Sequence, residues 1–448
     1  INIMSIHCTQ VFLSDDACFY CMKNLQERER FSLKRPNIHV DSIPALPYKI
    51  RVNQTDEVER MKKFWLFFAM VSFFVFQICA CGSDDSSKIK IGVIAELTGD
   101  VPAIGASCKN AAEMAVDEIN TAGGIQLGDK KYPVKLIIED NAGKADQSAS
   151  VAQKLITQQN VTAIVGPNAS LGAVPASTIA ESGRTVMITP WSTNPKTTMD
   201  MRTSQPKRYV FRACYSDAFE GHVLAMFVLN QLKLKRAATL YDVASEAPNS
   251  QSALFRRSFT ENGGVMTAFE TYTTGDRDFS AQLTKIRASN PEIIFLPTYY
   301  NDVPLIVAQA KRLGIKVPFL GSDAWSSPEL ITLSQGAVEG CYFANHYAAD
   351  SATPETQKFI KAYQARYNKL PDDVAALTYD SFGLLFQALK TAGSKDRQAV
   401  RDALAKIPQY EGVTGNMQFK EGSGDPIKSA VILKIKDGKF TWFANAKP

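Results

Sequence analysis

Apolar residues after residue 88 fall into two alternating patterns: short continuous runs, and longer stretches with apolar positions every three or four residues. The continuous runs are typical of strands buried on both faces, and the longer spacing is typical of helices with one buried face. Up to residue 195 the expected strands are 89–95, 135–139, 163–165 and 185–189, and the expected helices are 106–122, 145–159 and 170–182. This alternation predicts a parallel sheet with helices on both faces.

The same alternation restarts after a polar interval at 194–208. The expected strands are then 209–213, 237–241, 265–272, 293–297, 319–320, 430–436 and 440–443, with 341–346 extended. The expected helices are 220–231, 250–262, 279–288, 303–313, 354–367, 374–392 and 396–405. Since single domains usually hold ~50 to 200 residues, the repeated architecture predicts two lobes.

Polar residues follow two successive strands of the first lobe. Ser170 comes after Gly166-Pro167-Asn168 and stands at the expected N-cap of a helix, so that its hydroxyl and the free amides of the first turn point outward. Such a turn favours a carboxylate. Thr193 follows the next strand. Because ligands of open parallel sheets sit beyond the carboxyl ends of the strands, we expect Ser170 and Thr193 to face one crevice.

The front of the chain has a different character. Residues 1–60 carry charges of both signs without a sustained apolar period, and we expect them to be a non-native N-terminal extension. Residues 61–80 combine Lys62 and Lys63 with an apolar run from residue 64, a pattern typical of a secretory signal peptide. The run is also close to the length of a membrane-spanning helix, so an uncleaved anchor is the alternative.

Charge and cysteine content exclude several classes of protein. The charges of residues 1–60 cancel, and without the two lysines of the signal the formal charge falls from +5 to +3, with no basic stripe, which argues against nucleic-acid binding. Cys108, Cys214 and Cys341 are too scattered for a disulfide framework. Cys18 and Cys21 form a CxxC without a second pair, so we expect neither a metal nor a cofactor.

An enzyme is also disfavoured. The segment ASLG at 169–172 supplies only half of a GxSxG nucleophile elbow. His222 and His346 stand in no recognisable triad or metal motif, and no GxGxxG or GxxxxGK[ST] follows a strand. We therefore expect binding rather than catalysis.

Several segments carry a family resemblance. They are IKIGVIAELTGDVPAIG (89–105), AVDEINTAGGI (115–125), IVGPNASLGAVPAS (164–177), VMITPWSTNP (186–195), DFSAQLTKIRASNPEIIFLPTYYND (278–302), AQAKRLGIKVPFLGSDAW (308–325) and YEGVTGNMQF (410–419). In this order they resemble the extracytoplasmic solute-binding proteins of branched-chain amino acid ABC transporters, which are type I periplasmic binding proteins of the Leu/Ile/Val-binding family. Ile78-Cys79-Ala80-Cys81 likewise resembles the lipobox of bacterial lipoproteins, which implies that Cys81 carries lipid and that 81–88 is a tether.

The resemblance implies two Rossmann-like lobes with parallel sheets, joined by three hinge crossings that close around the ligand. The crossings are expected near 212–216, 341–346 and 412–419. Lobe 1 would then comprise 89–213 and 345–414, and lobe 2 would comprise 214–344 and 415–448. The implied protein is a monomeric, lipid-anchored component of the periplasm or cell envelope that delivers its solute to ABC permease and ATPase subunits.

The resemblance also implies a set of ligand-binding residues. Ser170 and Thr193 would bind the α-carboxylate of an amino acid, with Trp191 and Ser192 beside them, while Asp323 would pair with the α-ammonium. The remaining implied contacts are Tyr299, Ile104, Ala247 and Trp325. A zwitterion needs donors on one side and a carboxylate on the other, because charge-assisted hydrogen bonds are the strong ones.

The sequence departs from the family pattern at two positions of the expected pocket wall. Ala247 and Ile104 stand where relatives often carry an aromatic residue, and Trp191 and Trp325 flank the expected site. A branched-chain or other apolar amino acid is therefore the expected ligand, with an aromatic acid or amide as the alternative. A receptor-coupled sensor that binds the same ligands is the other function left open.

Overall fold

The computed structural model describes residues 87–351 and 353–446, all within one compact unit that spans 83–448. The expected extension, signal peptide and lipidated Cys81 lie outside the described residues. Within the described part of the chain, no helix combines the length and the apolar character needed to cross a membrane.

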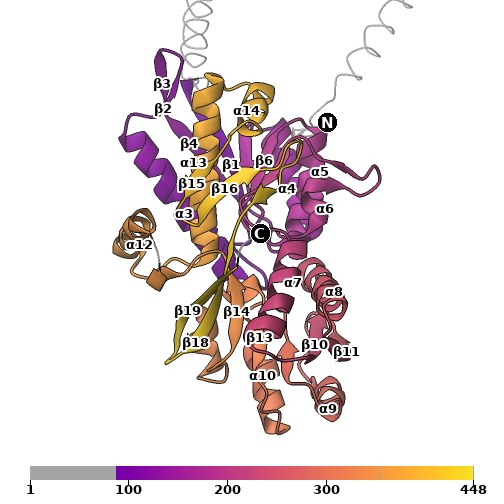
Figure 1. The fold of residues 1–448 in the computed structure, drawn as a ribbon. Helices are drawn as coiled ribbons and strands as arrows, with labels where there is room; N and C mark the ends of the chain where they lie inside the picture. The colour runs from indigo at the N-terminus through magenta and orange to yellow at the C-terminus, as the bar shows by residue number, and fades with distance from the viewer. Residues whose placement is uncertain (1–86, 352, 447–448) are drawn as a thin grey trace, which may run out of the picture. The chain divides into compact units, whose positions relative to one another are not determined.

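The first lobe is built on a five-stranded parallel sheet in the order β4-β1-β5-β6-β9 (Figure 1). Its strands are β1 (Ile89–Ala95), β4 (Val134–Asp140), β5 (Ala163–Val165), β6 (Val186–Thr189) and β9 (Val210–Arg212). The helices between them are α3 (Pro102–Thr121), α4 (Ala145–Thr157) and α5 (Ser170–Ser182). Two hairpins and a short helix complete this part: β2 (Ile125–Leu127) with β3 (Lys130–Tyr132), β7 (Met199–Asp200) with β8 (Gln205–Pro206), and α6 (Pro195–Thr198).

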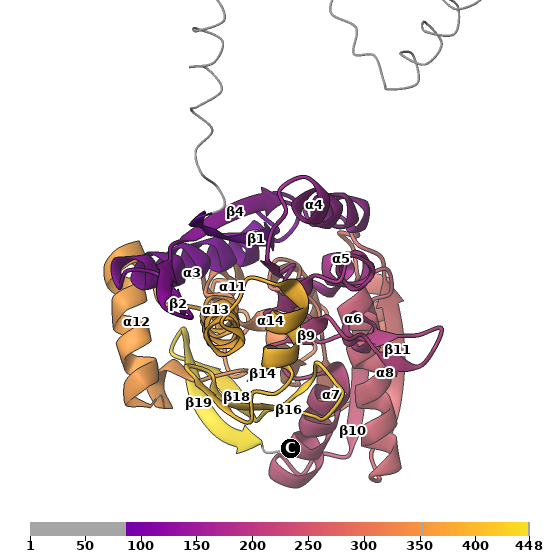
Figure 2. The same ribbon diagram turned by 90° about the horizontal axis from the view of Figure 1, so that it is seen from above.

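Alternate residues of these strands enter two separate cores. Val93 and Ile188 pack in the cluster that includes residues of α3, whereas Ile164 and Met187 pack with α4 and α5. Both faces of the sheet are therefore covered, and this explains why the strands appear in the sequence as continuous apolar runs. Figure 2 shows these helices around the sheet when the molecule is seen from above.

The second lobe is built on a seven-stranded mixed sheet in the order β11-β10-β12-β13-β14-β18-β19. The first five strands are parallel, and β18 and β19 add antiparallel pairs at one edge. The strands are β10 (Arg236–Asp242), β11 (Val265–Tyr272), β12 (Ile293–Phe295), β13 (Phe319–Gly321), β14 (Tyr342–Asn345), β18 (Ala430–Lys436) and β19 (Lys439–Ala446). The helices are α7 (Asp217–Met226), which continues as a π-helix (Phe227–Gln231), α8 (Glu246–Glu261), α9 (Ser280–Ala288), α10 (Val303–Arg312) and α11 (Glu329–Ser334), with short 3-10 turns at Asp323–Trp325 and Ala349–Ser351.

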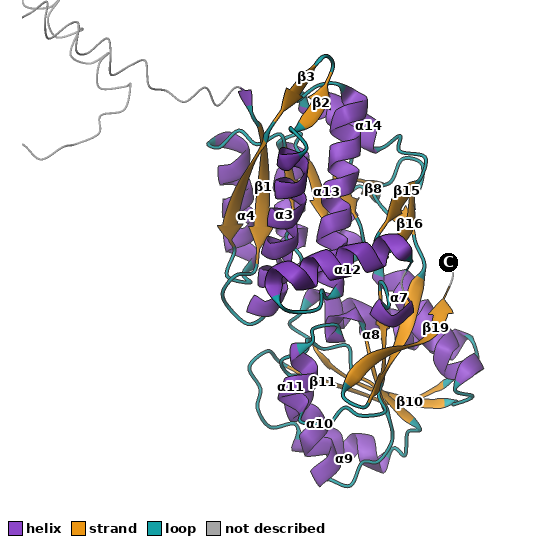
Figure 3. Cartoon of the chain, turned by 90° about the vertical axis from the view of Figure 1, so that its left-hand side faces the viewer, coloured by secondary structure: helices purple, strands orange, loops and turns teal. Residues whose placement is uncertain are grey.

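The last helices return to the first lobe. They are α12 (Pro354–Tyr367), α13 (Asp373–Ala392) and α14 (Arg397–Leu404), and Figure 3 shows α13 beside α3. The chain thus passes from one sheet to the other after β9 and again after β14. These two passages agree with the crossings expected near 212–216 and 341–346.

The third crossing lies later than the expected 412–419. Strands β15 (Tyr410–Gly412), β16 (Gly415–Phe419) and β17 (Pro426–Ile427) form a small separate sheet. This sheet is held to the first lobe, because the amide of Arg212 donates to the Gly424 carbonyl at 3.0 Å and the rings of Phe211 and Phe419 lie 5.3 Å apart. The chain enters the second sheet only at β18, so the crossing falls at 428–429.

Candidate ligand site

A small cavity is lined by residues from both lobes. Its lining residues are Ser170, Trp191 and Thr193 from the first lobe and Ala247, Gln251, Tyr299, Asp323 and Ala324 from the second. The first-lobe residues follow β5 and β6, and Tyr299 and Asp323 follow β12 and β13. The carboxyl ends of the two sheets therefore face the same space, as expected for open parallel sheets.

Ser170 is the first residue of α5 and not its N-cap. Ala169 occupies the cap position and makes no side-chain cap bond, so the expected capping role of Ser170 was wrong by one residue. The Ser170 hydroxyl instead accepts from Ser192 Oγ at 3.0 Å. At the first position of the helix, Ser170 still lies beside the unpaired amides that favour an anion.

A buried carboxylate holds the loop that leads to Ser170. Glu96 Oε1 accepts from the amides of Asn168 and Ala169, each at 3.1 Å, and Oε2 accepts from Asn168 Nδ2 at 2.8 Å. Burial raises the pKa of Glu96, while these hydrogen bonds act in the opposite direction. At Gly166 the backbone has φ of 91°, and a Cβ there would lie 2.1 Å from the Ile94 carbonyl oxygen. The turn therefore requires glycine.

Arg212 fixes the loop that carries Thr193. Its fully buried guanidinium donates to the carbonyls of Ser192 at 2.7 Å and Asn194 at 3.0 Å. Its Nε lies 2.7 Å from Asp425 Oδ1, which compensates the buried charge. Ser192 and Asn194 flank Thr193, so this cation sets the path of the backbone at the cavity wall.

Asp323 is the central acidic residue of the second-lobe wall. Its amide donates to Glu220 Oε1 at 2.8 Å, its Oδ1 accepts from Gln251 Nε2 at 3.3 Å, and its Oδ2 lies 3.2 Å from His346 Nε2. Burial raises the pKa of Asp323 to about 7. Burial also raises the pKa of Glu220 well above its usual value, and the nearby Asp323 charge adds to that shift. A positive group in the cavity would favour the ionised form of Asp323.

His346 connects this wall to the first lobe. Its ring stacks on Tyr215 with centroids 3.9 Å apart, and its Nε2 lies 4.0 Å from Asp373 Oδ2, at the start of α13. The same Asp373 oxygen accepts from Trp191 Nε1 at 2.9 Å. Burial, and secondarily the Lys428 charge, hold the pKa of His346 well below its usual range. This network joins cavity residues of both lobes through the second crossing.

Asp323, His346 and Asp373 also lie close enough to share a metal ion, since their potential ligand atoms are within 4.8 Å of one another. Both carboxylates, however, already accept side-chain hydrogen bonds, from Gln251 in one case and from Trp191 and Ser326 in the other. We therefore describe the group as a hydrogen-bonded network.

Comparisons of this chain with known proteins agree on one family. Residues 88–439 match the family model described as periplasmic binding protein. A Leu/Ile/Val-binding protein of Rhizobium johnstonii is 31% identical over 357 residues, which cover 79% of this chain and 93% of that protein. The leucine binding protein LivK of Thermotoga maritima has a TM-score of 0.74 and 33% identity, and the match covers 80% of this chain and 99% of that chain. The branched-chain amino acid transporter substrate binding protein LivJ of Streptococcus pneumoniae, solved in complex with isoleucine, has a TM-score of 0.73 and 33% identity, covering 81% of this chain and 100% of that chain.

The chain belongs to the periplasmic binding protein family. Its two lobes form the type I fold of that family, as the sequence resemblance implied. The family consists of solute-binding proteins that act outside the cytoplasm and are not enzymes.

Within this periplasmic binding protein, six of the nine predicted ligand-binding residues line one cavity: Ser170, Trp191, Thr193, Ala247, Tyr299 and Asp323. Direct contact of these residues with a ligand stays a prediction. Gln251 and Ala324 also line the cavity and were not predicted. The signal for Gln251 was available in the sequence, because it follows Ala247 by four residues and so shares its helix face.

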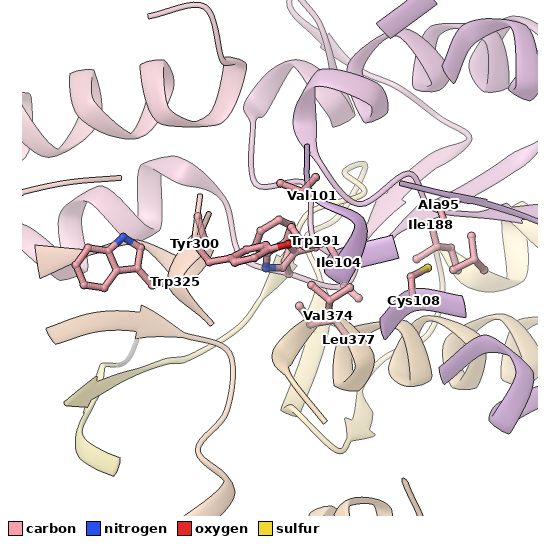
Figure 4. Close-up of a cluster of buried hydrophobic side chains, with 14 of the residues drawn as sticks. Ala95, Val101, Ile104, Cys108, Ile188, Trp191, Tyr300, Trp325, Val374 and Leu377 are labelled. Carbon is pink, nitrogen blue, oxygen red and sulfur yellow. The ribbon is translucent and has the colours of Figure 1, made fainter. Parts of the chain in front are cut away.

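The other three predicted residues lie behind the cavity wall. Ser192 supports Ser170 through the hydrogen bond described above. Trp325 is fully buried in the second lobe and donates from Nε1 to the Leu296 carbonyl at 3.0 Å. Ile104 is in the same buried cluster as Trp191 and Val374, and Figure 4 shows these side chains. Ile104 and Trp325 lie in or beside loops in the sequence, and this position does not show that their side chains pack in the core.

Proposed function

We propose that this protein captures an amino acid with an aliphatic side chain between its lobes and delivers it to an ABC permease. The supporting observation is the polarity of one shared cavity. Ser170, at the amino end of α5, and Thr193 lie on one wall, and the Asp323 carboxylate lies on the other. This arrangement suits the carboxylate and the ammonium of a zwitterion.

The rest of the lining favours an apolar side chain. Trp191 and Tyr299, whose ring centroids are 6.0 Å apart, supply apolar surface, and Ala247 and Ala324 supply small residues. A cavity lined by only eight residues suits a small solute rather than a peptide. The similar proteins named above include one solved with isoleucine, which agrees with this assignment.

Binding is proposed to act through differential affinity for two lobe arrangements. Contacts from both walls are made together only when the lobes are closed, so an occupied cavity shifts the population toward closure. The closed form is then the one recognised by the permease and ATPase subunits. No bond of the solute is broken.

A thermal-shift screen of the common amino acids, with benzoate and 4-methyl-2-oxopentanoate as amine-free acids, tests the ligand class. Leucine, isoleucine or valine should raise the melting temperature, because a ligand at 100 times its Kd stabilises the folded state by about 2.7 kcal/mol. Mass spectrometry of solutes that co-purify with the protein gives an independent identification. Stabilisation by an amine-free acid alone would contradict the assignment.

We also propose that Cys81 carries the lipid that anchors the protein to a membrane. The support is the lipobox-like sequence that ends at Cys81 and the extracytoplasmic location of the family. Cys81→Ser should release the protein from the membrane fraction, and mass spectrometry of the wild-type N-terminal peptide should show a lipid adduct. A variant that stays in the membrane fraction would favour the uncleaved anchor instead.

A further inference from the structure

Gln251 and Ala247 line the cavity together from helix α8. Gln251 lies one turn after Ala247 on the same face of this helix. Gln251 is only 1% exposed. The small side chain of Ala247 leaves space through which Gln251 reaches the ligand region.

Two carboxyl groups fix the orientation of the Gln251 amide. Its Nε2 donates to Glu220 Oε2 at 2.7 Å and to Asp323 Oδ1 at 3.3 Å. The amide nitrogen is the donating atom of this side chain, and it faces both carboxyl groups. The amide oxygen, Oε1, is consequently turned away, and among the described residues it has no hydrogen-bond partner although it is buried. A buried acceptor without a partner costs free energy that a matching donor restores.

We propose that Gln251 is a specificity-determining residue whose Oε1 accepts a hydrogen bond from the α-ammonium of the bound amino acid. This inference rests on the proposed function. An ammonium has three N–H donors, of which Asp323 would take one and Gln251 another. A hydroxy acid offers a single O–H donor at the same place, so one of the two acceptors would stay unpaired, and a site built to pair with N–H groups discriminates against such a ligand. Gln251 would therefore select amino acids against hydroxy acids of the same shape.

Isothermal titration calorimetry of the purified protein with L-leucine and with (S)-2-hydroxy-4-methylpentanoate tests the proposal. In Gln251→Leu, which keeps similar bulk but removes the amide, the affinity for leucine should fall about 10- to 100-fold. The hydroxy acid should lose less, so that the preference for leucine over the hydroxy acid falls about tenfold or more. An equal loss for both ligands, or no loss, would overturn the proposal.

A crystal structure of the wild-type leucine complex provides a second readout that does not depend on a variant. The ligand nitrogen should lie within about 3.2 Å of Gln251 Oε1. A nitrogen beyond hydrogen-bond reach of Oε1, or an Oε1 that instead bonds the side chain of the ligand, would overturn the proposal even if affinities change.

Gln309→Leu is the matched control. Gln309 is also a buried glutamine of the second lobe, but it accepts from the Phe279 amide at 2.8 Å and donates to the Arg277 carbonyl at 2.7 Å, and it does not line the cavity. Removal of the Gln309 amide in this variant should lower the melting temperature, while the preference for leucine over the hydroxy acid stays unchanged. If wild-type protein binds no amino acid, the proposed function fails; if it binds leucine and Gln251→Leu keeps the preference, only the Gln251 assignment fails.

Discussion

At the scale of single residues, the Asp323 carboxyl is the ionisable group of the cavity wall that contacts the largest number of the polar groups described above. Asp323 is 3% exposed, and the groups around it include Glu220, Gln251 and His346. Since His346 is held largely neutral by burial, the positive charge that Asp323 would best pair with is that of a ligand. The residue is thus arranged to be satisfied more fully with an ammonium in the cavity than without one.

Replacing Asp323 should therefore weaken amino-acid binding severely. In Asp323→Ala the ammonium would be buried without its counter-charge, which costs about 3 to 5 kcal/mol. Calorimetry with L-leucine measures the loss. Asp278→Ala is the control, because Asp278 is an exposed second-lobe carboxylate that accepts from Ser280 outside the cavity. Equal affinities for wild type and Asp323→Ala would refute the assigned role.

Ligand affinity should also depend on pH through Asp323. Burial raises the pKa of this carboxyl to about 7, and an ammonium beside it would lower the pKa in the complex. Binding below about pH 7 must then release a proton, so affinity should fall by up to ~10-fold per pH unit below that value and level off above it. Calorimetry in buffers of different ionisation enthalpy counts the released proton. A flat profile between about pH 5.5 and 7.5 would contradict this linkage.

The same shift affects the stability of the ligand-free protein with the opposite sign. The folded-state pKa of Asp323 lies above its ordinary value of 3.8. Its contribution to stability is therefore fully present below about pH 3.8 and is lost as the pH rises through about 7. Ligand binding and folding of the empty protein thus respond to this carboxyl in opposite directions.

At the scale of secondary-structure elements, the turn between β5 and α5 positions the cavity wall that carries Ser170. Gly166 adopts a left-handed conformation in close contact with β1, and Glu96 holds the following amides. Ser170 owes its position to these constraints and not to a cap of its own. The wall is therefore sensitive to changes that do not touch the cavity.

Gly166→Ala should destabilise the protein by more than the 1 to 3 kcal/mol that a strained backbone typically costs. The added Cβ would meet the Ile94 carbonyl oxygen at 2.1 Å. Urea denaturation measures the change, and Gly275→Ala separates strain from clash, because Gly275 has φ of 94° with nothing within 4 Å of its Cβ position. Similar losses in both variants would show that the close contact is unimportant.

The sequence was sufficient to predict the helices and strands that are long enough to show a regular spacing of apolar residues. Strands 265–272 and 430–436 and helix 354–367 have the expected bounds, because each segment is long enough for its pattern of apolar residues to be recognised. Short strands such as β2 and β17 were not predicted, since so few residues carry no period. The third crossing was misplaced because the hydrogen bond between Arg212 and Gly424 joins residues that are far apart in the sequence.

Site prediction had a similar limit. Residues directly after a strand, such as Thr193 and Asp323, were found from strand ends and family resemblance, and the structure brings them to one cavity. Gln251 was missed because the expected helix began at residue 250, whereas α8 begins at Glu246 and places Ala247 and Gln251 on one face. Trp325 was placed at the ligand because its neighbour Asp323 is there, but its ring packs over Gly321, where a Cβ would lie 2.3 Å away.

At the scale of the whole binding unit, contacts across the mouth of the cavity hold the lobes together. Lys196 of the first lobe and Glu246 of the second form an ion pair at 2.8 Å, and Asn194 Nδ2 donates to the Glu246 carbonyl at 3.1 Å. Elsewhere, Asn301 Nδ2 donates to the Asp100 carbonyl at 3.3 Å. Because these contacts join the two lobes, opening of the lobes in the proposed binding cycle would break them, and they would then stabilise the closed form.

Lys196→Ala should accelerate ligand dissociation modestly. The side chains of the Lys196 and Glu246 pair are 47% and 34% exposed, so the loss should stay within about 1 kcal/mol and should diminish at high salt. Stopped-flow measurement of leucine release provides the rate. Lys285→Ala removes a comparable pair with Glu270 within the second lobe and should leave the rate unchanged. A dissociation rate that is the same for Lys196→Ala and wild type would show that this pair does not help to keep the lobes closed.

The burial of the two opposed walls has a kinetic consequence. Ser170 and Asp323 are only 2% and 3% exposed, so a solute held between them would be shielded from the surrounding water by both lobes. Its residence time is then set by how often the hinges part, and a chase with excess unlabelled amino acid should not shorten it at any concentration. Lobe opening would then be the slowest step of solute release. A permease that opens the lobes would accelerate this release without competing for any contact with the solute.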